Sequence, residues 1–359
     1  MKIAIVHDSL ADGDPLRVVR AMIGAYPDAM VHTVLGGRIA SRSPLSAAGP
    51  PTVTDHLPLP LLAPAVSTLH VEADLTLVSS TGWAHGVRTS GRKIVYCHAP
   101  SRWTSDNVAD GAGRWARLAN RARTSRMATW DRAVAQTAER YLVKSAAMRT
   151  EVERAYGIEA QILPPPAGVD ADGPRVPMPG IKPGYLLCVE PLQSHRNLDA
   201  VIDAMRMLPD AALVVAGDGP LRRHLDDVAG SNVVFVGDVP DWSLRWLYAN
   251  AAVVVGASVD DFNAGPVEAA AHGVPFVGPR RGTYLDTVRH GVTGLLFDLI
   301  DDRSIAGALM AAQRCSWDAD ALRRHADRFG ERQFITSLRA VVGGTGPVQQ
   351  TFSMLSVAS

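Results

Sequence analysis

The chain has 359 residues, 47% of them apolar, and is long enough for two domains with separate buried cores. Basic and acidic residues number 36 each, and this balance gives no sign of a nucleic-acid-binding protein or of an acidic tail. The three cysteines, Cys97, Cys188 and Cys315, are too few and too widely spaced for a zinc site or a disulfide framework. Their number and spacing favour a reducing compartment.

The first residues predict a strand and not a targeting segment. Met1 leads directly into the apolar run Ile3–Val6, without the long apolar core and the small-residue cleavage site of a signal peptide. Apolar runs elsewhere are also too short to span a bilayer. We therefore expect a cytoplasmic protein, and a peripheral position at the inner membrane face stays open.

Short apolar runs alternate with amphipathic stretches along most of the chain. Several runs lack the polar–apolar alternation of half-exposed strands, which is typical of strands covered on both faces by helices. The predicted strands are Ile3–Val6, Leu75–Ser79, Lys93–Cys97, Arg140–Lys144, Gln161–Leu163, Tyr185–Val189, Ala212–Ala216, Val233–Val236, Ala252–Val255 and Pro275–Val277. The predicted helices are Pro15–Tyr26, Arg114–Glu139, Ala146–Tyr156, Leu198–Met207, Pro220–Ala229, Ser243–Ala249, Gly265–Ala271 and Arg303–Arg314. Such alternation predicts an α/β fold with parallel sheets.

A segment dense in proline and glycine, from Pro164 to Pro183, interrupts this alternation. Prolines at this density do not fit helices or central strands. We interpret the segment as a linker between domains 1–168 and 169–318, and a surface loop within one domain is the alternative.

The stretch from Asp260 to Pro275 carries the most specific chemical signal. It follows a predicted strand, and ligands bind beyond the carboxyl ends of strands in open α/β sheets. Gly265 and Pro266 suit the turn into a helix, whose first N–H groups favour phosphate. Glu268 falls in the first turn, where its carboxylate can accept hydrogen bonds from ribose hydroxyls. Taken alone, the stretch is more typical of a capped helix without a ligand.

The same stretch resembles the signature of the family-four retaining glycosyltransferases, in which seven residues separate two acidic ones, as they separate Asp260 and Glu268. The resemblance covers roughly residues 1–342. It implies the GT-B architecture, an α/β fold in which two Rossmann-like domains face each other across a cleft. It also implies that Asp260 lies beside the donor sugar and that Glu268 binds the nucleotide ribose. Asn263 stands where the family usually has glycine.

Other positions in the C-terminal half resemble the family's donor site. Arg196 matches a lysine that binds the donor diphosphate, whereas Pro191 replaces an arginine with the same task. Gly217 matches a strand–turn–helix segment, and Val236 matches a strand that lines the base. The implied donor-binding set in this half is Glu268, Gly265, Pro266, Asn263, Ala264, Gly217 and Val236.

The N-terminal half resembles the family at looser motifs. Gly13 matches a turn whose N–H groups face the donor phosphates, although a carboxylate at Asp14 would repel a diphosphate. His98 follows a predicted strand, and the resemblance places it beside the transferred sugar, with Arg102 in the substrate-binding set. The resemblance also implies that a helix over about 319–345 crosses back onto the N-terminal domain.

These matches imply a metal-independent hexosyltransferase with His98, Asp260 and Arg196 as its catalytic residues. It would move mannose or glucose from a GDP- or UDP-linked nucleotide sugar to a hydroxyl of a glycan, lipid-linked or small-molecule acceptor. No cofactor, no metal and no nucleic acid partner is expected. The alternative is a catalytically weakened protein that binds sugar nucleotide or partners an active transferase, because Asp14, Pro191 and Asn263 depart from the family's pattern.

An arginine-rich stretch from Arg114 to Arg132 also contains Trp115 and Trp130. A basic helix with aromatic residues can lie on an anionic membrane or bind a lipid-pyrophosphate acceptor. A solvated helix with its tryptophans in the core is the competing interpretation, and we rank it slightly ahead.

Overall fold

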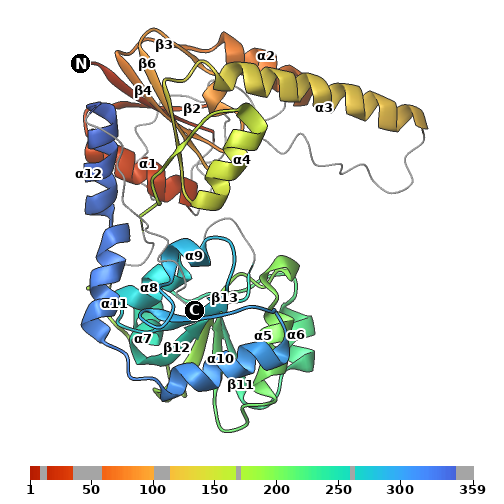
Figure 1. Ribbon diagram of the computed structural model, residues 1–359, viewed down its shortest axis with the longest axis vertical. Coiled ribbons are helices and arrows are strands. Elements are labelled where there is room, and N and C mark those ends of the chain that lie inside the picture. Colours follow the sequence, from red (N-terminus) through yellow and green to blue (C-terminus); the bar gives the residue numbers. More distant parts are fainter. Residues whose placement is uncertain (9–13, 35–58, 101–113, 167–170, 259–262, 345–359) are drawn as a thin grey trace, which may run out of the picture. The chain divides into compact units, whose positions relative to one another are not determined.

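The structure, a computed structural model, describes residues 1–8, 14–34, 59–100, 114–166, 171–258 and 263–344 (Figure 1). The chain divides into two compact units. Unit 1 comprises Met1–Pro166 together with Phe334–Ser359, and unit 2 comprises Ala167–Gln333. None of the described helices is long and apolar enough to cross a bilayer.

Unit 1 is built on a six-stranded sheet whose paired strands all run parallel. In spatial order its strands are β2 (Met30–Thr33), β1 (Ile3–His7), β4 (Leu75–Ser80), β6 (Arg92–Cys97), β7 (Arg140–Val143) and β8 (Gln161–Ile162). A separate pair is formed by β3 (His70–Val71) and β5 (Arg88–Thr89). The helical elements are α1 (Asp14–Ala25), α2 (Leu59–Thr68), η2 (Ala84–Gly86), α3 (Arg114–Ala135) and α4 (Ala146–Tyr156).

Unit 2 contains a second parallel sheet of six strands. In spatial order these are β11 (Val233–Gly237), β10 (Leu213–Ala216), β9 (Tyr185–Val189), β12 (Ala251–Val255), β13 (Phe276–Pro279) and β14 (Gly294–Phe297). The α-helices are α5 (Leu198–Met205), α6 (Arg222–Val228), α7 (Asp241–Asn250), α8 (Gly265–Ala271), α9 (Tyr284–Thr287), α10 (Asp302–Arg314) and α11 (Ala319–Ala326). The short helices are η4 (Ser194–Arg196) and η5 (Asp327–Phe329).

Each sheet is covered on both faces, which explains why its central strands are largely apolar. In β9, Leu186 and Cys188 join one buried cluster, while Tyr185 and Leu187 join a second one. Successive side chains of a strand point to opposite faces, so both faces of this sheet must be apolar. The predicted α/β class with parallel sheets is therefore confirmed.

The end of the chain differs from the single helix expected over 319–345. Two helices are present, α11 and α12 (Glu331–Val342), and Gly330 between them has an extended backbone. α11 packs on α8 in unit 2. α12 packs on unit 1, where Phe334 and Leu338 are buried in the same cluster as side chains of α1 and β1. Only the second half of the expected helix therefore lies on the N-terminal unit.

Helix α12 lies beside α1 (Figure 1), and two polar contacts fix its position in unit 1. The guanidinium of Arg339 donates to the carbonyl oxygen of Ala25 at 2.8 Å. Arg92, at the start of β6, donates to the carbonyl oxygen of Val342 at 2.8 Å. These bonds satisfy carbonyls at the ends of both helices, which have no partner within their own helix.

Truncation of Phe334 tests how much α12 contributes to unit 1. We expect Phe334→Ala to lower the free energy of unfolding by about 3 kcal/mol or more, because it opens a cavity in a closed apolar cluster. Urea denaturation followed by circular dichroism measures the change. Thr336→Ala, at an exposed position of the same helix, is the control. Equal stability of the two variants would show that α12 is not part of the core of unit 1.

Candidate active site

The sheet of unit 2 reverses its strand order at β9. The chain adds β10 and β11 on one side of β9 and then places β12, β13 and β14 on the other. At such a point the loops after the two neighbouring strands diverge and leave a crevice beyond their carboxyl ends, where ligands of open α/β sheets bind. The loops after β9 and β12 therefore define the candidate site.

Glu190 directly follows β9, and its side chain is buried, with 5% of the residue exposed. One carboxylate oxygen lies 3.0 Å from a terminal guanidinium nitrogen of Arg196, whose side chain is 19% exposed. The other accepts a 2.5 Å hydrogen bond from the amide nitrogen of Asn263. Glu190 is not among the site residues predicted from the sequence, whereas Arg196 and Asn263 are.

Asn263 lies in the loop between β12 and α8 and connects four groups. Besides Glu190, its amide nitrogen lies 3.1 Å from the hydroxyls of Ser258 and Tyr284. Its side-chain oxygen accepts a 2.7 Å hydrogen bond from the N–H of Gly265, the first residue of α8. The N–H that we expected to face phosphate thus donates to a side chain of the protein.

Glu268 is buried in the first turn of α8, with 6% of the residue exposed. The hydroxyl of Tyr248, on α7, donates to its carboxylate at 2.8 Å. Burial and the neighbouring carboxylate of Glu268 raise the pKa of Tyr248 well above its ordinary value, so the phenol stays protonated and keeps donating. His272 stacks on the Tyr248 ring, with centroids 5.0 Å apart, and this packing fixes the ring beside Glu268.

Arg196 is positioned by the residue that follows it. Asn197 has a left-handed backbone, with φ of 53°, which asparagine adopts more readily than most residues. Its side-chain amide donates to the carbonyl oxygen of Ala257 at 2.9 Å, so the loop after β9 is bonded to the loop after β12. The backbone at Arg196 is therefore held at the crevice by contacts that do not involve its own side chain.

The remaining residues of the predicted donor-binding set have modest roles in the structure. Gly217 has φ of 127°, and a Cβ at this position would collide with the carbonyl oxygen of Glu190, so the glycine allows close backbone packing without any ligand. Pro266 is buried at the start of α8, whereas Ala264 and Val236 are half-buried. Gly13, Arg102 and Asp260 lie outside the described residues.

In unit 1, polar groups gather at the carboxyl ends of β1, β4 and β6. His98, after β6, is buried, and its Nε2 atom lies 2.8 Å from the hydroxyl of Ser79 at the end of β4. Burial, with a smaller contribution from the charge of Lys144, lowers the pKa of His98 to about 3. The imidazole is therefore neutral near pH 7 and can take part in hydrogen bonds without carrying charge.

Asp8, which follows β1, holds the loop after β4. Its carboxylate accepts hydrogen bonds from the hydroxyl of Thr81 at 2.8 Å, from the N–H of Trp83 at 3.1 Å, and from the N–H groups of Thr81 and Ala84. Four donors on one buried carboxylate make a rigid loop. Asp8 therefore has a structural role, which is to hold the loop after β4 against the end of β1.

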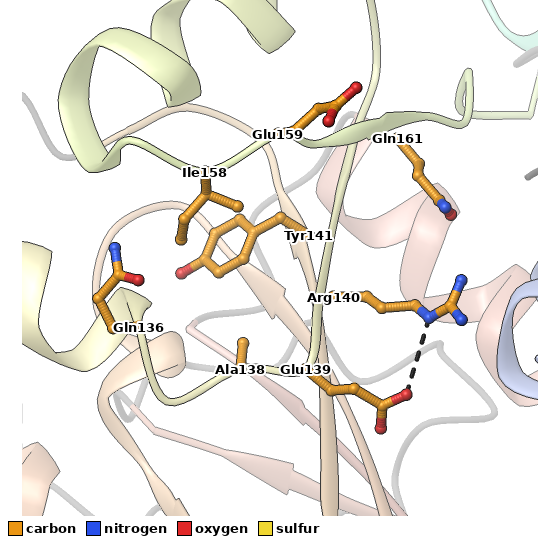
Figure 2. Close-up of a pocket in the computed structure, with 8 residues that line it drawn as sticks. All are labelled: Gln136, Ala138, Glu139, Arg140, Tyr141, Ile158, Glu159 and Gln161. Carbon is orange, nitrogen blue, oxygen red and sulfur yellow. Dashed lines mark ion pairs between the residues drawn. The ribbon is translucent and has the colours of Figure 1, made fainter.

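Two cavities lie away from these residues. The first, of about 470 Å³, opens in unit 1 beside the amino-terminal ends of β7 and β8 (Figure 2). Its lining includes Gln161 and Arg140. The Nε atom of Arg140 lies 3.7 Å from a carboxylate oxygen of Glu139. The second, of about 480 Å³, lies beside Tyr185 and Ala212, at the amino-terminal ends of β9 and β10 in unit 2. Both occupy the edge of a sheet opposite to its candidate site. Within the described ranges, no three His, Cys, Asp or Glu side chains are grouped closely enough to hold a metal ion.

Residues 183–313, which contain the crevice with Glu190, Arg196 and Glu268, match the family described as "Glycosyl transferases group 1". The chain carries a group 1 glycosyltransferase domain. The resemblance noted in the sequence is thereby confirmed, and Arg196 and Glu268 belong to this glycosyltransferase domain.

Curated relatives share sequence with the chain over part of their length. A GDP-mannose-dependent alpha-mannosyltransferase of Corynebacterium glutamicum is 36% identical over 93 residues, which cover 26% of this chain and 22% of that protein. A GDP-mannose-dependent alpha-(1-6)-phosphatidylinositol monomannoside mannosyltransferase of Mycolicibacterium smegmatis is 32% identical over 213 residues. That match covers 49% of this chain and 55% of the relative, so the chain spans about half of the relative's length.

Solved structures resemble the chain over nearly its whole length. The Anabaena protein HepE in complex with UDP has a TM-score of 0.70 at 18% identity, with 96% of this chain and all 100% of that chain covered. The lipopolysaccharide outer core galactosyltransferase WaaB, in its apo form, has a TM-score of 0.69 at 13% identity, with coverage of 96% and 99%. At these identities the likeness establishes the fold, and the expectation of a GT-B fold is confirmed.

The buried His98 predicts a pH dependence of stability. The unfolded histidine takes up a proton near its ordinary pKa of 6.5, whereas the folded one does so only near pH 3. Below pH 6.5 the unfolded state therefore binds more protons, and stability falls with falling pH. We expect His98 to account for about 2 kcal/mol of the loss between pH 7 and pH 5.

Urea denaturation at a series of pH values measures this contribution. His98→Gln should lose less stability than the wild type on acidification, while His70→Gln, at an exposed histidine of β3, should behave as the wild type. Identical pH profiles for His98→Gln and the wild type would contradict the burial of a neutral imidazole.

Proposed function

We propose that this chain is a retaining hexosyltransferase, which moves a sugar from a nucleotide-sugar donor to a hydroxyl group without a metal ion. The observation that carries the proposal is the crevice of the group 1 domain. There, Arg196 ends η4, after β9, and Glu268 lies in the first turn of α8, after β12, so the two residues follow the two strands between which the strand order reverses. In this proposal Glu268 accepts hydrogen bonds from the ribose hydroxyls, and Arg196 faces the diphosphate.

The chemistry of the proposed reaction explains why a cation is needed. As the bond between the sugar and the diphosphate breaks, negative charge grows on the leaving diphosphate. A cation beside it stabilises the transition state more than the bound substrate, which accelerates the reaction. The leaving diphosphate itself accepts the acceptor's proton, so that acceptor attack and leaving-group departure occur on one face of the sugar. The residues Asp260 and His98 are proposed to contact that sugar.

GDP-mannose is the proposed first donor, and UDP-glucose the second. The curated relatives are named as GDP-mannose-dependent enzymes, and a further solved structure with the fold is of HepE with UDP-glucose. The acceptor is proposed to be a glycan, a lipid-linked sugar or a small molecule with a free hydroxyl. A cytoplasmic location, with peripheral contact at the inner membrane face, completes the proposal.

A donor panel tests the activity directly. Purified protein is incubated with UDP- and GDP-linked hexoses, with and without candidate acceptors, and release of the nucleoside diphosphate is measured. We expect turnover with at least one donor, unchanged by EDTA, and retention of the anomeric configuration in the product. Turnover that EDTA abolishes would refute metal independence, and an inverted product would refute the retaining mechanism.

Substitution of Glu268 tests the nucleotide site. Glu268→Ala should weaken nucleotide binding by about 1–3 kcal/mol, the usual range for lost hydrogen bonds to a charged group. Glu268→Gln keeps an acceptor for Tyr248 and should give a smaller loss. Asp320→Ala, at an exposed carboxylate of α11, is the control. Titration calorimetry with GDP and UDP measures the affinities. Unchanged affinity in folded Glu268→Ala protein would remove Glu268 from the site.

One observation favours the second candidate, a weakened transferase that binds sugar nucleotide or partners an active enzyme. Arg196, the cation assigned to the diphosphate, already faces the buried carboxylate of Glu190 at 3.0 Å. A donor must compete with that carboxylate. Binding of nucleotide sugar without turnover for any donor and acceptor in the panel would support this candidate over the transferase.

Helix α3 is the proposed membrane-facing element. Its sequence contains six arginines and one acidic residue, Asp131. Trp130, near its C-terminal end, is half-buried, packs against Trp83 and donates to the hydroxyl of Ser67, so this tryptophan is engaged by unit 1 itself. In this proposal the arginines of α3, and not Trp130, contact the lipid. Salt screens the attraction between arginine and an anionic surface, so binding should weaken as ionic strength rises.

Vesicle flotation tests the membrane proposal. The protein should float with vesicles of phosphatidylcholine and phosphatidylglycerol at low ionic strength and remain unbound with phosphatidylcholine alone. Arg117→Glu combined with Arg121→Glu should abolish flotation. Equal recovery of the double variant and the wild type with anionic vesicles would rule out α3 as the contact.

A further inference from the structure

Glu190 is a buried negative charge at the place where the proposed function puts a diphosphate. Its residue is 5% exposed, and it stands at the carboxyl end of β9, where the strand order of unit 2 reverses. Like charges in a poorly solvated crevice repel strongly, because little water is present to screen them. A diphosphate therefore cannot simply be added to this site while Arg196 and Glu190 keep their contact.

The carboxylate is held in place by neutral groups as well as by Arg196. Asn263 donates to one of its oxygens at 2.5 Å, and the Asn263 amide is itself fixed by the hydroxyls of Ser258 and Tyr284. Burial, followed by the charge of Glu190, raises the pKa of Tyr284, so its hydroxyl remains protonated. These neutral contacts do not depend on Arg196 and can hold Glu190 when the guanidinium leaves.

The backbone around Arg196 is fixed, so its side chain can change partner without a movement of the loop. Asn197 is bonded to Ala257 at 2.9 Å, and the N–H of Arg196 donates to the carbonyl oxygen of Gln193 at 3.0 Å. The Arg196 side chain is the more exposed of the pair, at 19% against 5% for that of Glu190. The cation can therefore change partner more readily than the carboxylate, which its neutral contacts hold in place.

We propose that Glu190 is an internal counter-anion of the donor site, which holds Arg196 while the site is empty and which the donor diphosphate must displace. The proposal rests on the proposed function and adds a residue that sets the affinity for phosphate-bearing ligands. Glu190 raises the cost of binding any diphosphate, and it does so without touching the nucleoside. Its effect therefore depends on the phosphates of the ligand and not on the base or the ribose.

Glu190→Gln separates the charge from the shape. The amide keeps an oxygen that can accept from Asn263 and has nearly the size of the carboxylate, but it no longer binds Arg196 as a counter-ion. We expect the dissociation constants of UDP and GDP to fall about tenfold or more, the size expected when one like charge is removed a few ångströms from a diphosphate. Those of uridine and guanosine should stay unchanged. Titration calorimetry at fixed ionic strength measures all four ligands.

Three further variants make the test specific. Asp318→Asn removes one negative charge from unit 2 and keeps its role as the cap of α11, because asparagine also accepts from the Asp320 and Ala321 N–H groups. Asp318 is next to Ala319, which packs beside Gly273 near the amino-terminal end of β13, at the edge of the sheet opposite the candidate site. Asp318→Asn should therefore change no nucleotide affinity. Glu190→Gln combined with Arg196→Gln should lose the gain in UDP and GDP affinity, because the cation that binds the diphosphate is then absent. Glu190→Ser replaces Glu190→Gln if the latter does not fold.

The outcomes distinguish this proposal from the proposed function. Wild-type binding of UDP or GDP with no gain in the Glu190 variant would overturn the counter-anion role and leave the nucleotide site standing. An equal gain for uridine and UDP would also overturn it, because Glu190 would then act through shape. If neither the wild type nor the Glu190 variants bind any of the four ligands, both proposals fail.

Discussion

The hydrogen bond between Asn263 and Glu190 joins the two loops on which the crevice of unit 2 depends. It connects residues 73 positions apart, one after β9 and one before α8. The same asparagine accepts from the N–H of Gly265, so the start of α8, and with it Glu268, is placed relative to β9. A buried amide of this kind must have its partners, since an unpaired one would cost about 1–3 kcal/mol. The positions of Glu268 and Arg196 thus both depend on Asn263, through the start of α8 in one case and through Glu190 in the other.

Much of the fold could be predicted from the sequence, because a strand buried on both faces has little choice of residues. The central strands β1, β4, β6, β9 and β10 stand out as apolar runs between helical patterns. The strands at two sheet edges, β2 and β14, were missed. Each has four residues, and three of the four in β2, Met30, His32 and Thr33, are polar or exposed, so the local pattern of β2 resembles a loop. The break at Gly330 was also missed, since the apolar periodicity continues across it.

The site was predicted where a motif fixes spacing and missed where only the fold brings groups together. Glu268 and Arg196 were predicted as site residues because both occupy positions of a recognisable segment. Glu190 was not predicted, because nothing in its local sequence distinguishes it from other residues that follow strands. Its partner Asn263 lies 73 positions further along the chain. One signal was available. Asn263 stands where the family has glycine, and a new side chain in a crowded turn needs a partner for its amide. A nearby buried carboxylate is such a partner.

Helix α12, which completes the core of unit 1, follows the whole of unit 2 in the chain. Residues 1–166 leave the ribosome long before Phe334, Leu338 and Val341, which cover the face of the sheet beside Met22 and Leu142. Unit 2 is one continuous piece of chain and can close as soon as residue 333 has emerged. Unit 2 can therefore complete its core during synthesis before unit 1 can complete its own. The first half of the protein remains open along one apolar face, a natural target for chaperones, until the last helix arrives.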